Sequence, residues 1–236
     1  MENHKVVSRD QWIEARKQLL AKEKEFTRLR DQLSQQRREL PWERADKEYV
    51  FEGPNGKETL SQLFAGKSQL IVYHFMFDPT WEAGCKSCSF WADNFNGIDV
   101  HLKHRAVSFL AISRAPFAKL AAYKKRMGWS FKWMSSFGTD FNYDYYVSFT
   151  PEDVAKGSAY WNYQRQKPFE AETVGISVFY KDPSGAVFHT YSCYSRGVDM
   201  LNGAYHYIDL TPKGRDEGEQ GANPQAWVRR HDEYED

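Results

Sequence analysis

Two cysteines at Cys-x-x-Cys spacing, Cys85 and Cys88, constrain the fold of this chain more than any other feature. They follow a nearly unbroken apolar run at 69–77 and begin an amphipathic run. This order is typical of a buried strand, a loop and a helix whose first turn carries both thiols. Free N–H groups and the positive dipole end at a helix N-terminus stabilise a thiolate, which is the nucleophile in disulfide exchange. Cys88 lies one turn further along the same face, where it can attack a mixed disulfide formed by Cys85, so the motif predicts thiol redox chemistry.

The segments around the cysteines predict a mixed α/β sheet. The run at 69–77 is apolar on both faces, as expected for a central strand covered by helices on both sides. A second buried strand at 106–113 and a helix that stops at Gly128 follow, which implies a right-handed parallel crossover. Two short strands at 174–180 and 186–192 are joined by a turn sequence, so they predict an antiparallel hairpin.

Two residues, one inside these strands and one directly after them, carry reactive side chains. His74 lies inside the central strand, and we expect it to be a hydrogen-bonded core residue. Cys193 follows the hairpin and would lie on the order of 10 Å from the thiol strand at sheet spacing. We expect Cys193 to be an inert, partly buried thiol.

Residues 1–42 predict a helical extension. Ser8 is a helix cap with a glutamine at the capping-box position, and neither glycine nor proline follows before residue 40. Apolar side chains recur every seven residues, at Trp12, Leu19, Phe26 and Leu33. A helix of this length would extend roughly 45 Å at about 1.5 Å per residue. Its apolar stripe can lie across its own domain or pair with the same helix of a second chain, so a homodimer through this helix remains open.

The rest of the chain predicts one domain at 43–210 and a polar C-terminal tail at 211–236, anchored at most by Trp227. Within the domain, an aromatic-rich insertion at 137–172 is too long for an ordinary connection. The insertion could be a lid that forms an aromatic pocket over the thiols. The slightly favoured alternative is a packed embellishment or an oligomer surface, because aromatic-rich insertions more often bury than bind.

Charge and composition narrow the class of partner. Lysine plus arginine and aspartate plus glutamate number 32 each, so no basic excess points to nucleic acid. No secretory signal opens the sequence and no apolar run reaches the length of a membrane span. Three cysteines in 236 residues are not a disulfide scaffold, so a cytoplasmic, reducing setting fits best. We expect no cofactor, and as partners a protein or small-molecule thiol or disulfide substrate and an electron donor that the sequence does not identify.

Motifs along nearly the whole chain resemble those of one bacterial family. They are Trp12-Ile-Glu-Ala-Arg-Lys, Glu39-Leu-Pro-Trp42, Tyr49-Val-Phe-Glu-Gly-Pro54, Tyr73-His-Phe-Met-Phe77, Gly84-Cys-Lys-Ser-Cys-Ser-Phe-Trp91, Ser113-Arg-Ala-Pro116, Phe141-Asn-Tyr-Asp144 and Gly175-Ile-Ser-Val-Phe-Tyr180. The family is thioredoxin-like, has long been labelled a domain of unknown function and is described as predicted dithiol-disulfide oxidoreductases. The resemblance implies a thioredoxin-like fold, with Cys85 as the attacking thiolate and Cys88 as the resolving thiol.

The cysteine loop departs from that of thioredoxin itself. Gly84 stands where thioredoxins have a tryptophan, and lysine and serine replace the Gly-Pro pair between the cysteines. The cis-proline that faces the thiols in thioredoxins corresponds to Thr173-Val174, which contains no proline. The reduction potential of thioredoxin therefore does not transfer to this chain.

Four residues are candidate substrate contacts: Trp81, Lys86, Arg114 and Val174. Trp81 can cover the thiols or pack under the loop, and Lys86 can place charge near the sulfur or remain a solvated surface residue. Arg114 follows the second parallel strand at its carboxyl end, where open sheets bind ligands. It is a candidate for holding an acidic substrate group, although a surface ion pair is the slightly favoured interpretation. Val174 is included because it takes the cis-proline position.

The sequence is also compatible with two other functions. A non-catalytic zinc-binding or thiol-sensing module would use Cys85, Cys88, His101 and His104, whose spacing nearly matches a zinc finger. In one continuous helix His101 would lie roughly 20 Å from the thiols, so we expect no metal unless the chain reverses at 96–97. A thiol-dependent peroxide reductase could use the same thiols, but the peroxiredoxin pattern of proline, threonine and cysteine fails in register.

Overall fold

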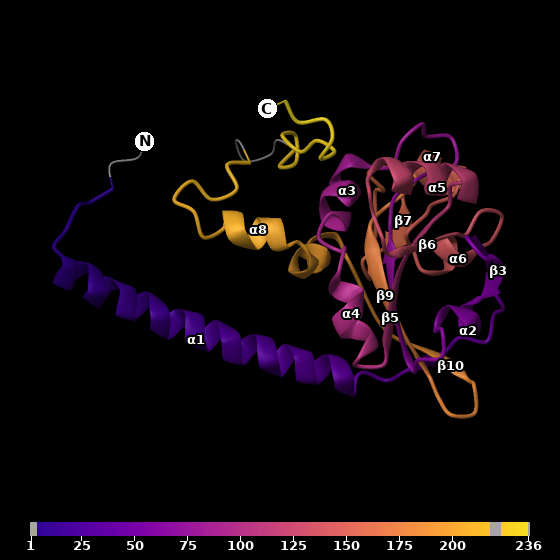
Figure 1. Cartoon of the computed structure of the whole chain (residues 1–236), viewed down its shortest axis with the longest axis horizontal. Helices are drawn as coiled ribbons and strands as arrows, with labels where there is room; N and C mark the ends of the chain where they lie inside the picture. Colours follow the sequence, from indigo (N-terminus) through magenta and orange to yellow (C-terminus); the bar gives the residue numbers. More distant parts are fainter. Residues whose placement is uncertain (1–3, 218–222, 236) are drawn as a thin grey trace. The chain divides into compact units, whose positions relative to one another are not determined.

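The N-terminal helix α1 (Arg9–Glu39) begins at the predicted capping box. The computed structural model describes residues 4–217 and 223–235 and divides after Pro41 into two units (Figure 1). Ser8 Oγ accepts the N–H of Gln11 at 3.3 Å, and Gln11 Oε1 accepts the N–H of Ser8 at 3.2 Å. The helix ends where Leu40 becomes extended ahead of the proline. Within the described residues, no helix combines the length and apolar character that crossing a membrane requires.

The second unit is built on an eight-stranded mixed sheet. Its strand order is β1-β10-β9-β4-β5-β6-β2-β3. The central strand β4 is parallel to β5 and antiparallel to β9, and β5 is parallel to β6. The strands are β1 (Glu43–Arg44), β2 (Val50–Gly53), β3 (Gly56–Thr59), β4 (Gln69–His74), β5 (Val107–Ser113), β6 (Lys132–Ser135), β9 (Gly175–Lys181) and β10 (Val187–Tyr194).

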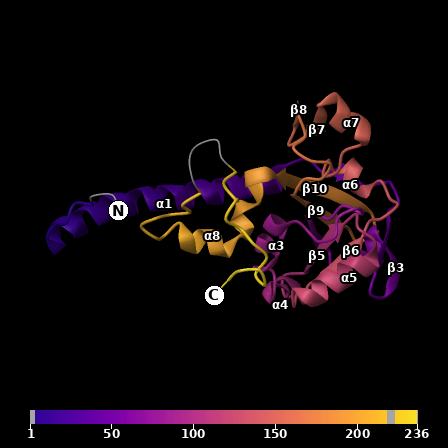
Figure 2. The same cartoon turned by 90° about the horizontal axis from the view of Figure 1, so that it is seen from above.

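Helices cover both faces of the sheet, because β4 carries apolar side chains on each face. Tyr73 packs in a cluster with side chains of α3 and α5, whereas Leu70 and Val72 pack with those of α2 and α6 on the other face. Figure 2 shows α3, α4 and α5 on one side of the sheet. The helices are α2 (Leu60–Leu63), α3 (Lys86–Ala92), α4 (Ile98–Lys103), α5 (Phe117–Arg126) and α6 (Phe141–Asp144).

The arrangement of the central strands is thioredoxin-like. β4 leads into the cysteine loop and α3, the chain crosses over to parallel β5, and the β9–β10 hairpin pairs beside β4. The predicted α/β fold with a central mixed sheet and flanking helices is therefore confirmed. The helical segment after the cysteines is broken at 96–97, since α3 ends at Ala92 and α4 begins after Gly97, whose φ of 86° lies in the left-handed region.

The insertion at 137–172 contributes to the core and to a separate hairpin. Phe141 and Tyr145 pack in the core cluster that contains Leu70 and Val72. The following elements, α7 (Pro151–Lys156), β7 (Ala159–Trp161) and β8 (Gln164–Gln166), lie on the side of the sheet opposite α4 and α5 (Figure 2). β7 and β8 form a two-stranded sheet of their own.

The chain after the hairpin differs from the prediction. After the hairpin come the 3-10 helix η1 (Ser195–Leu201) and the helix α8 (Gly203–Ile208). They are separated at Asn202, which caps α8 by accepting the N–H of Tyr205 at 3.1 Å. The C-terminal tail was expected to be loosely held, and this expectation is wrong for residues 223–235. In this segment Val228 is fully buried, and Arg230 Nη2 donates to the Gly84 carbonyl at 2.8 Å.

Candidate active site

Backbone hydrogen bonds place Cys85 at the start of α3. The N–H of Ala115 donates to the Phe77 carbonyl at 2.8 Å, which ties the loop after β4 to the end of β5. The N–H of Cys85 itself donates to the Met76 carbonyl at 3.1 Å. Cys85 is the N-cap residue of α3, so its sulfur lies beside the free N–H groups of the first turn.

Gly84 lets the loop pass close to two aromatic rings. A Cβ atom at this position would lie 2.7 Å from Phe75 Cε1 and 2.9 Å from Tyr123 Cε1. The hydroxyl of Tyr123 in turn contacts Ser89 Oγ at 2.8 Å, and Ser89 Oγ donates to the Cys85 carbonyl at 2.8 Å. The tryptophan that thioredoxins have before the first cysteine would not fit here.

The two cysteines are free thiols whose pKa values are shifted in opposite directions. A hydrogen bond from the Cys88 thiol, opposed by burial and reinforced by the N–H groups of Cys88 and Ser87, lowers the pKa of Cys85 to about 7. Burial, followed by the interaction with Cys85, raises the pKa of Cys88 well above its ordinary value. Cys85 keeps part of its surface exposed, whereas Cys88 is 2% exposed. The pair therefore consists of an accessible thiolate and a buried thiol that donates to it.

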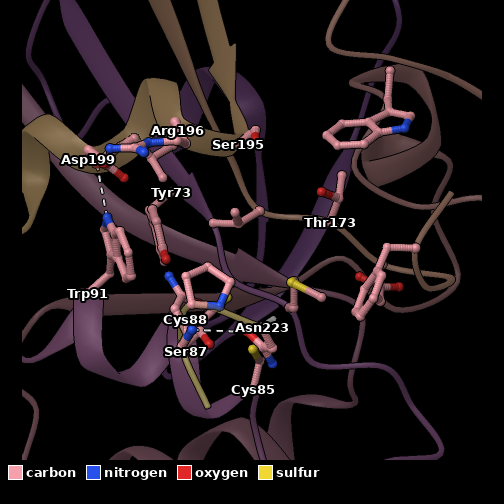
Figure 3. Close-up of a pocket in the computed structure, with 18 of the residues that line it drawn as sticks. Tyr73, Cys85, Ser87, Cys88, Trp91, Thr173, Ser195, Arg196, Asp199 and Asn223 are labelled. Atoms are coloured by element: carbon pink, nitrogen blue, oxygen red, sulfur yellow. Dashed lines mark hydrogen bonds and ion pairs between the residues drawn. The ribbon is translucent and has the colours of Figure 1, made fainter. Parts of the chain in front are cut away.

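Tyr73 is a site residue that the sequence did not reveal. It is fully buried in β4, and Figure 3 shows its hydroxyl turned toward Cys88. Burial, followed by the neighbouring Cys88 sulfur, raises the pKa of Tyr73 well above its ordinary value, so the hydroxyl stays protonated. A protonated hydroxyl beside Cys88 favours the thiolate form of Cys88 and partly offsets the effect of burial on its pKa.

A cavity of about 370 Å³ opens above the thiols (Figure 3). Its size is that of a site for a small molecule or a single side chain, and most of its lining is apolar. The walls come from β4 and α3, the insertion, the segment before β9, η1 and the C-terminal segment. The lining residues are Tyr73, Met76, Cys85, Ser87, Cys88, Trp91, Phe149, Trp161, Phe169, Glu172, Thr173, Val174, Ser195, Arg196, Val198, Asp199, Asn223, Pro224 and Gln225.

The structure brings only one of the four predicted substrate contacts into this cavity. Val174 lines it, next to Thr173. Trp81 packs against the core beneath the loop, and its carbonyl accepts from Lys119 Nζ at 3.0 Å. Lys86 Nζ donates to the Ala226 carbonyl at 3.4 Å. Trp81 and Lys86 therefore position the loop and the C-terminal segment.

Arg114, the fourth predicted contact, is occupied by the protein's own carboxylates. Its guanidinium forms ion pairs with Asp78 at 2.5 Å and with Glu172 at 2.7 Å, and a further nitrogen contacts the Tyr143 hydroxyl. The arginine side chain is 15% exposed and does not line the cavity. The favoured alternative of an ion pair is what the structure shows, although this pair is buried and not on the surface.

Glu172 is the second site residue that the sequence did not reveal. It is 2% exposed and lines the cavity that contains both thiols. Burial, partly offset by Arg114 and Ser148 and reinforced by Asp78, raises the pKa of Glu172 to about 7. This glutamate therefore exchanges its proton in the same pH range as Cys85.

The remaining predicted reactive groups lie elsewhere. Cys193 is 8% exposed in β10, where its thiol donates to the Gly197 carbonyl at 3.5 Å, and it does not line the cavity. His74 is buried, with Nε2 2.8 Å from Ser177 Oγ. His101 lies in α4 and His104 caps it. Over the described ranges, no three His, Cys, Asp or Glu side chains come together in a way that could hold a metal ion.

Together the fold and the site define a thioredoxin-like protein with a reduced Cys-x-x-Cys pair in a cavity. The chain belongs to the family described as bacterial protein of unknown function (DUF899), which matches residues 1–234. The curated proteins contain no match to it.

Solved structures with a similar chain path share little sequence with it. The peroxidoxin BcpB of Mycobacterium tuberculosis has 13% identity and a TM-score of 0.43, over 72% of this chain and 97% of its own. Peroxiredoxin Q of Xanthomonas campestris has 14% identity and a TM-score of 0.41, over 66% and 87%. A protein assigned as thiol:disulfide interchange protein DsbE of Chlorobium tepidum has 13% identity and a TM-score of 0.38, over 71% and 94%.

Proposed function

We propose that this protein is a dithiol-disulfide oxidoreductase in which Cys85 attacks and Cys88 resolves. The observation that carries the proposal is the opposite shift of the two thiols. The pKa of Cys85 is lowered to about 7 and that of Cys88 is raised, so one thiolate is ready at neutral pH while its neighbour stays protonated. The cavity gives a substrate sulfur access to Cys85.

The chemistry follows from these roles. The Cys85 thiolate attacks one sulfur of a disulfide R–S–S–R′, which forms a Cys85–S–S–R bond and releases R′S⁻. Cys88 then loses its proton and attacks the Cys85 sulfur, which releases RS⁻ and leaves a Cys85–Cys88 disulfide. Two electrons have moved from the protein to the substrate. A dithiol reductant restores the pair by the reverse exchange, and it is the electron donor that the cycle requires.

The lining of the cavity favours a low-molecular-weight disulfide or one apolar side chain next to a disulfide. The residues Phe149, Trp161 and Val174 give it an apolar wall, and its volume of about 370 Å³ is in the range of small-ligand sites. Arg196 and Asp199 from η1 supply charges on the wall for polar groups of the substrate.

The deciding experiment is a redox equilibration of the metal-analysed protein across a dithiol buffer series. Alkylation and peptide mass mapping count the Cys85–Cys88 disulfide at each potential. We expect reversible bridging at a potential between about −270 and −120 mV, the range of known oxidoreductases. Cys88→Ser should accumulate a mixed disulfide on Cys85, and Cys193→Ala should leave the equilibrium unchanged. A pair that never bridges, or that holds a metal ion, would refute the proposal.

Hydroperoxide consumption should be measured on the same preparation. A thiolate in an accessible cavity can also be oxidised by a peroxide to a sulfenic acid, which Cys88 would then convert to the disulfide. We expect slower turnover with hydroperoxides than with small disulfides. Faster turnover with a hydroperoxide than with every disulfide tested would make peroxide reduction the function.

A further inference from the structure

The cavity wall holds a buried carboxyl group that thiol exchange, as described above, does not yet use. Glu172 has a side chain that is 1% exposed to solvent, and it lines the same cavity as Cys85 and Cys88. The segment that carries it lies directly before β9, and a bridge between Ser148 and Glu172 fixes its backbone. Burying the charged form of this carboxyl group costs free energy unless the charge is paired, so its position in the cavity wall calls for a structural or functional explanation.

Arg114 does not neutralise the Glu172 carboxyl alone, because it also pairs with Asp78. One guanidinium lies between Asp78 and Glu172, so two carboxylates share a single positive charge. Asp78 has further support, since Thr80 donates to Asp78 Oδ1 from its N–H at 2.9 Å and from its hydroxyl at 2.7 Å. These contacts and Arg114 outweigh the effect of burial and lower the pKa of Asp78. The proton of this pair of carboxyls therefore belongs to Glu172.

The contacts of Glu172 fall on one of its two oxygens. Ser148 Oγ donates to Oε1 at 3.0 Å, and Arg114 Nε lies 2.7 Å from the same atom. Among the described residues, Ser148 is the side chain that hydrogen-bonds to the Glu172 carboxyl, and its bond goes to Oε1 and not to Oε2. With Oε1 directed to Ser148 and Arg114, Oε2 is the atom that can carry a proton toward the cavity.

We propose that Glu172 is a catalytic acid that protonates the leaving thiolate when Cys85 attacks a disulfide substrate. This inference rests on the proposed function and adds a role for the cavity wall opposite the thiols. It assigns the substrate class as disulfides whose leaving thiol is basic, such as alkyl disulfides, because these leave slowly as free thiolates.

One proton accounts for the step. The reacting form carries its one proton on Glu172 and has Cys85 as the thiolate, and it is populated at neutral pH because the pKa of each group is about 7. The Cys85 thiolate attacks R–S–S–R′, the S–S bond breaks and the new Cys85–S–S–R bond forms. The departing R′S⁻ takes the proton from Glu172 Oε2 and leaves as R′SH. Glu172 is left as a carboxylate and takes up one proton from solvent before the next cycle.

The groups around Glu172 are compatible with this proton transfer. Arg114 and Asp78 form a pair of opposite charges on its protein side, and Tyr143 contacts Arg114. From the cavity side it is faced by the thiols, Tyr73, and the pair Arg196 and Asp199, which ion-pair at 3.1 Å. The local charge therefore changes mainly through Glu172 and Cys85 between pH 6 and 8, because the pKa of each of these two groups is about 7.

The test compares two small disulfides with different leaving thiols in stopped-flow reactions with the reduced full-length chain. One is an alkyl disulfide, and the other is a nitro-substituted aryl disulfide whose thiolate needs no proton to leave. Glu172→Gln keeps an oxygen for Ser148 and Arg114 but has no acidic proton. We expect it to slow attack on the alkyl disulfide about tenfold or more and to leave the aryl disulfide within about twofold, since an acid is needed only for a basic leaving group. Glu170→Gln, an exposed neighbour, is the matched control and should change neither rate.

Equal effects of Glu172→Gln on the two disulfides, or no effect on either, would overturn the role of Glu172. The unmodified chain offers a second test that does not depend on a variant. Its rate with the aryl disulfide should rise with pH to a plateau as Cys85 ionises, whereas its rate with the alkyl disulfide should pass through a maximum and fall as Glu172 loses its proton. Plateaus for both disulfides would also overturn the inference. If the unmodified chain attacks neither disulfide and Cys85 never bridges to Cys88, the proposed function itself has failed.

Discussion

At the scale of the residue, Gly84 shows how a single missing side chain positions the thiols. Gly84→Ala would place a Cβ atom 2.7 Å from Phe75 Cε1 and 2.9 Å from Tyr123 Cε1, both in the packed core. We expect the free energy of unfolding to fall by about 1–3 kcal/mol, the usual cost of overpacking. The loop should also shift Cys85 away from the N–H groups of α3, which would raise its pKa and slow its alkylation at neutral pH. Urea unfolding and iodoacetamide kinetics measure the two effects.

The control for Gly84→Ala is Gly138, which does not line the cavity that contains the thiols. Gly138 has no neighbouring atom within 4 Å of an added Cβ atom, but its φ is +76°, so Gly138→Ala is strained by its backbone alone. This variant should lose stability without any change in the alkylation of Cys85. If Gly84→Ala alkylates at the rate of the unmodified chain, the close approach of the loop to the two rings does not control the thiol.

The sequence reveals the thiols of the candidate site but not the groups that tune them. Cys85 and Cys88 are recognisable because spacing along one helix turn is a local property, and Val174 follows from its position in the hairpin. Tyr73 counts as one more apolar residue in a strand, and Glu172 is one carboxylate within a polar segment. Their roles depend on burial and on partners from distant parts of the chain, such as the pairing of Glu172 with Arg114. Such partners are not encoded in any periodicity.

At the scale of the element, the strand β7 forms a wall of the cavity, which argues that the insertion acts on substrate. Trp161 lines the cavity, whereas Tyr160 on the same strand packs against Tyr146. Trp161→Ala should raise KM for an apolar disulfide severalfold with little change in kcat, because it removes contact area and no reacting group. Tyr160→Ala is the matched control. Unchanged KM in both variants would assign the insertion a packing role only, as the sequence slightly favoured.

The central strand β4 makes stability depend on pH through His74. Burial, followed by the charge of His189, lowers the pKa of His74 to about 3. The folded state therefore binds fewer protons than the unfolded state below pH 6.5, so this stability is full above that value and is lost as pH falls toward 3. The loss in the free energy of unfolding amounts to about 2 kcal/mol by pH 5.

Glu172 acts in the opposite direction, because its raised pKa gives stability that is present at low pH and is lost as pH rises from 4.5 to about 7.

The opposing contributions of His74 and Glu172 to the pH dependence of stability can be separated with two variants. In Glu172→Gln, which removes the second contribution, the free energy of unfolding should fall by about 2 kcal/mol between pH 7 and pH 5. Adding His74→Asn should remove most of that slope, whatever its effect on absolute stability. Urea denaturation at a series of pH values measures both slopes. Equal slopes in the single and the double variant would show that His74 does not titrate between the folded and unfolded states.

At the scale of the whole molecule, the division after Pro41 separates redox chemistry from the helical extension. Every residue that lines the cavity belongs to the unit from Trp42 onward. The order of its central elements could be predicted because apolar runs, the crossover and the turn at 181–185 are local signals. The split of the last helix at Asn202 and the buried C-terminal segment could not, since Asn202 and Arg230 act through partners formed only by folding. Because all of the cavity lining lies in the unit from Trp42 onward, residues 42–236 should keep the reduction potential of the full chain.

The helical extension is expected to join two copies of the chain. Its stripe of Trp12, Leu19, Phe26 and Leu33 has the heptad spacing of a coiled coil, and each of these side chains keeps at least 43% of its surface exposed within its unit. We predict that the full chain sediments as a dimer and that residues 42–236 sediment as a monomer. Phe26→Lys should dissociate the dimer because it places a charge in the apolar seam, whereas Thr27→Lys, one residue off the stripe, should not. A full chain that sediments as a monomer at micromolar concentration would show that the stripe packs on its own chain instead.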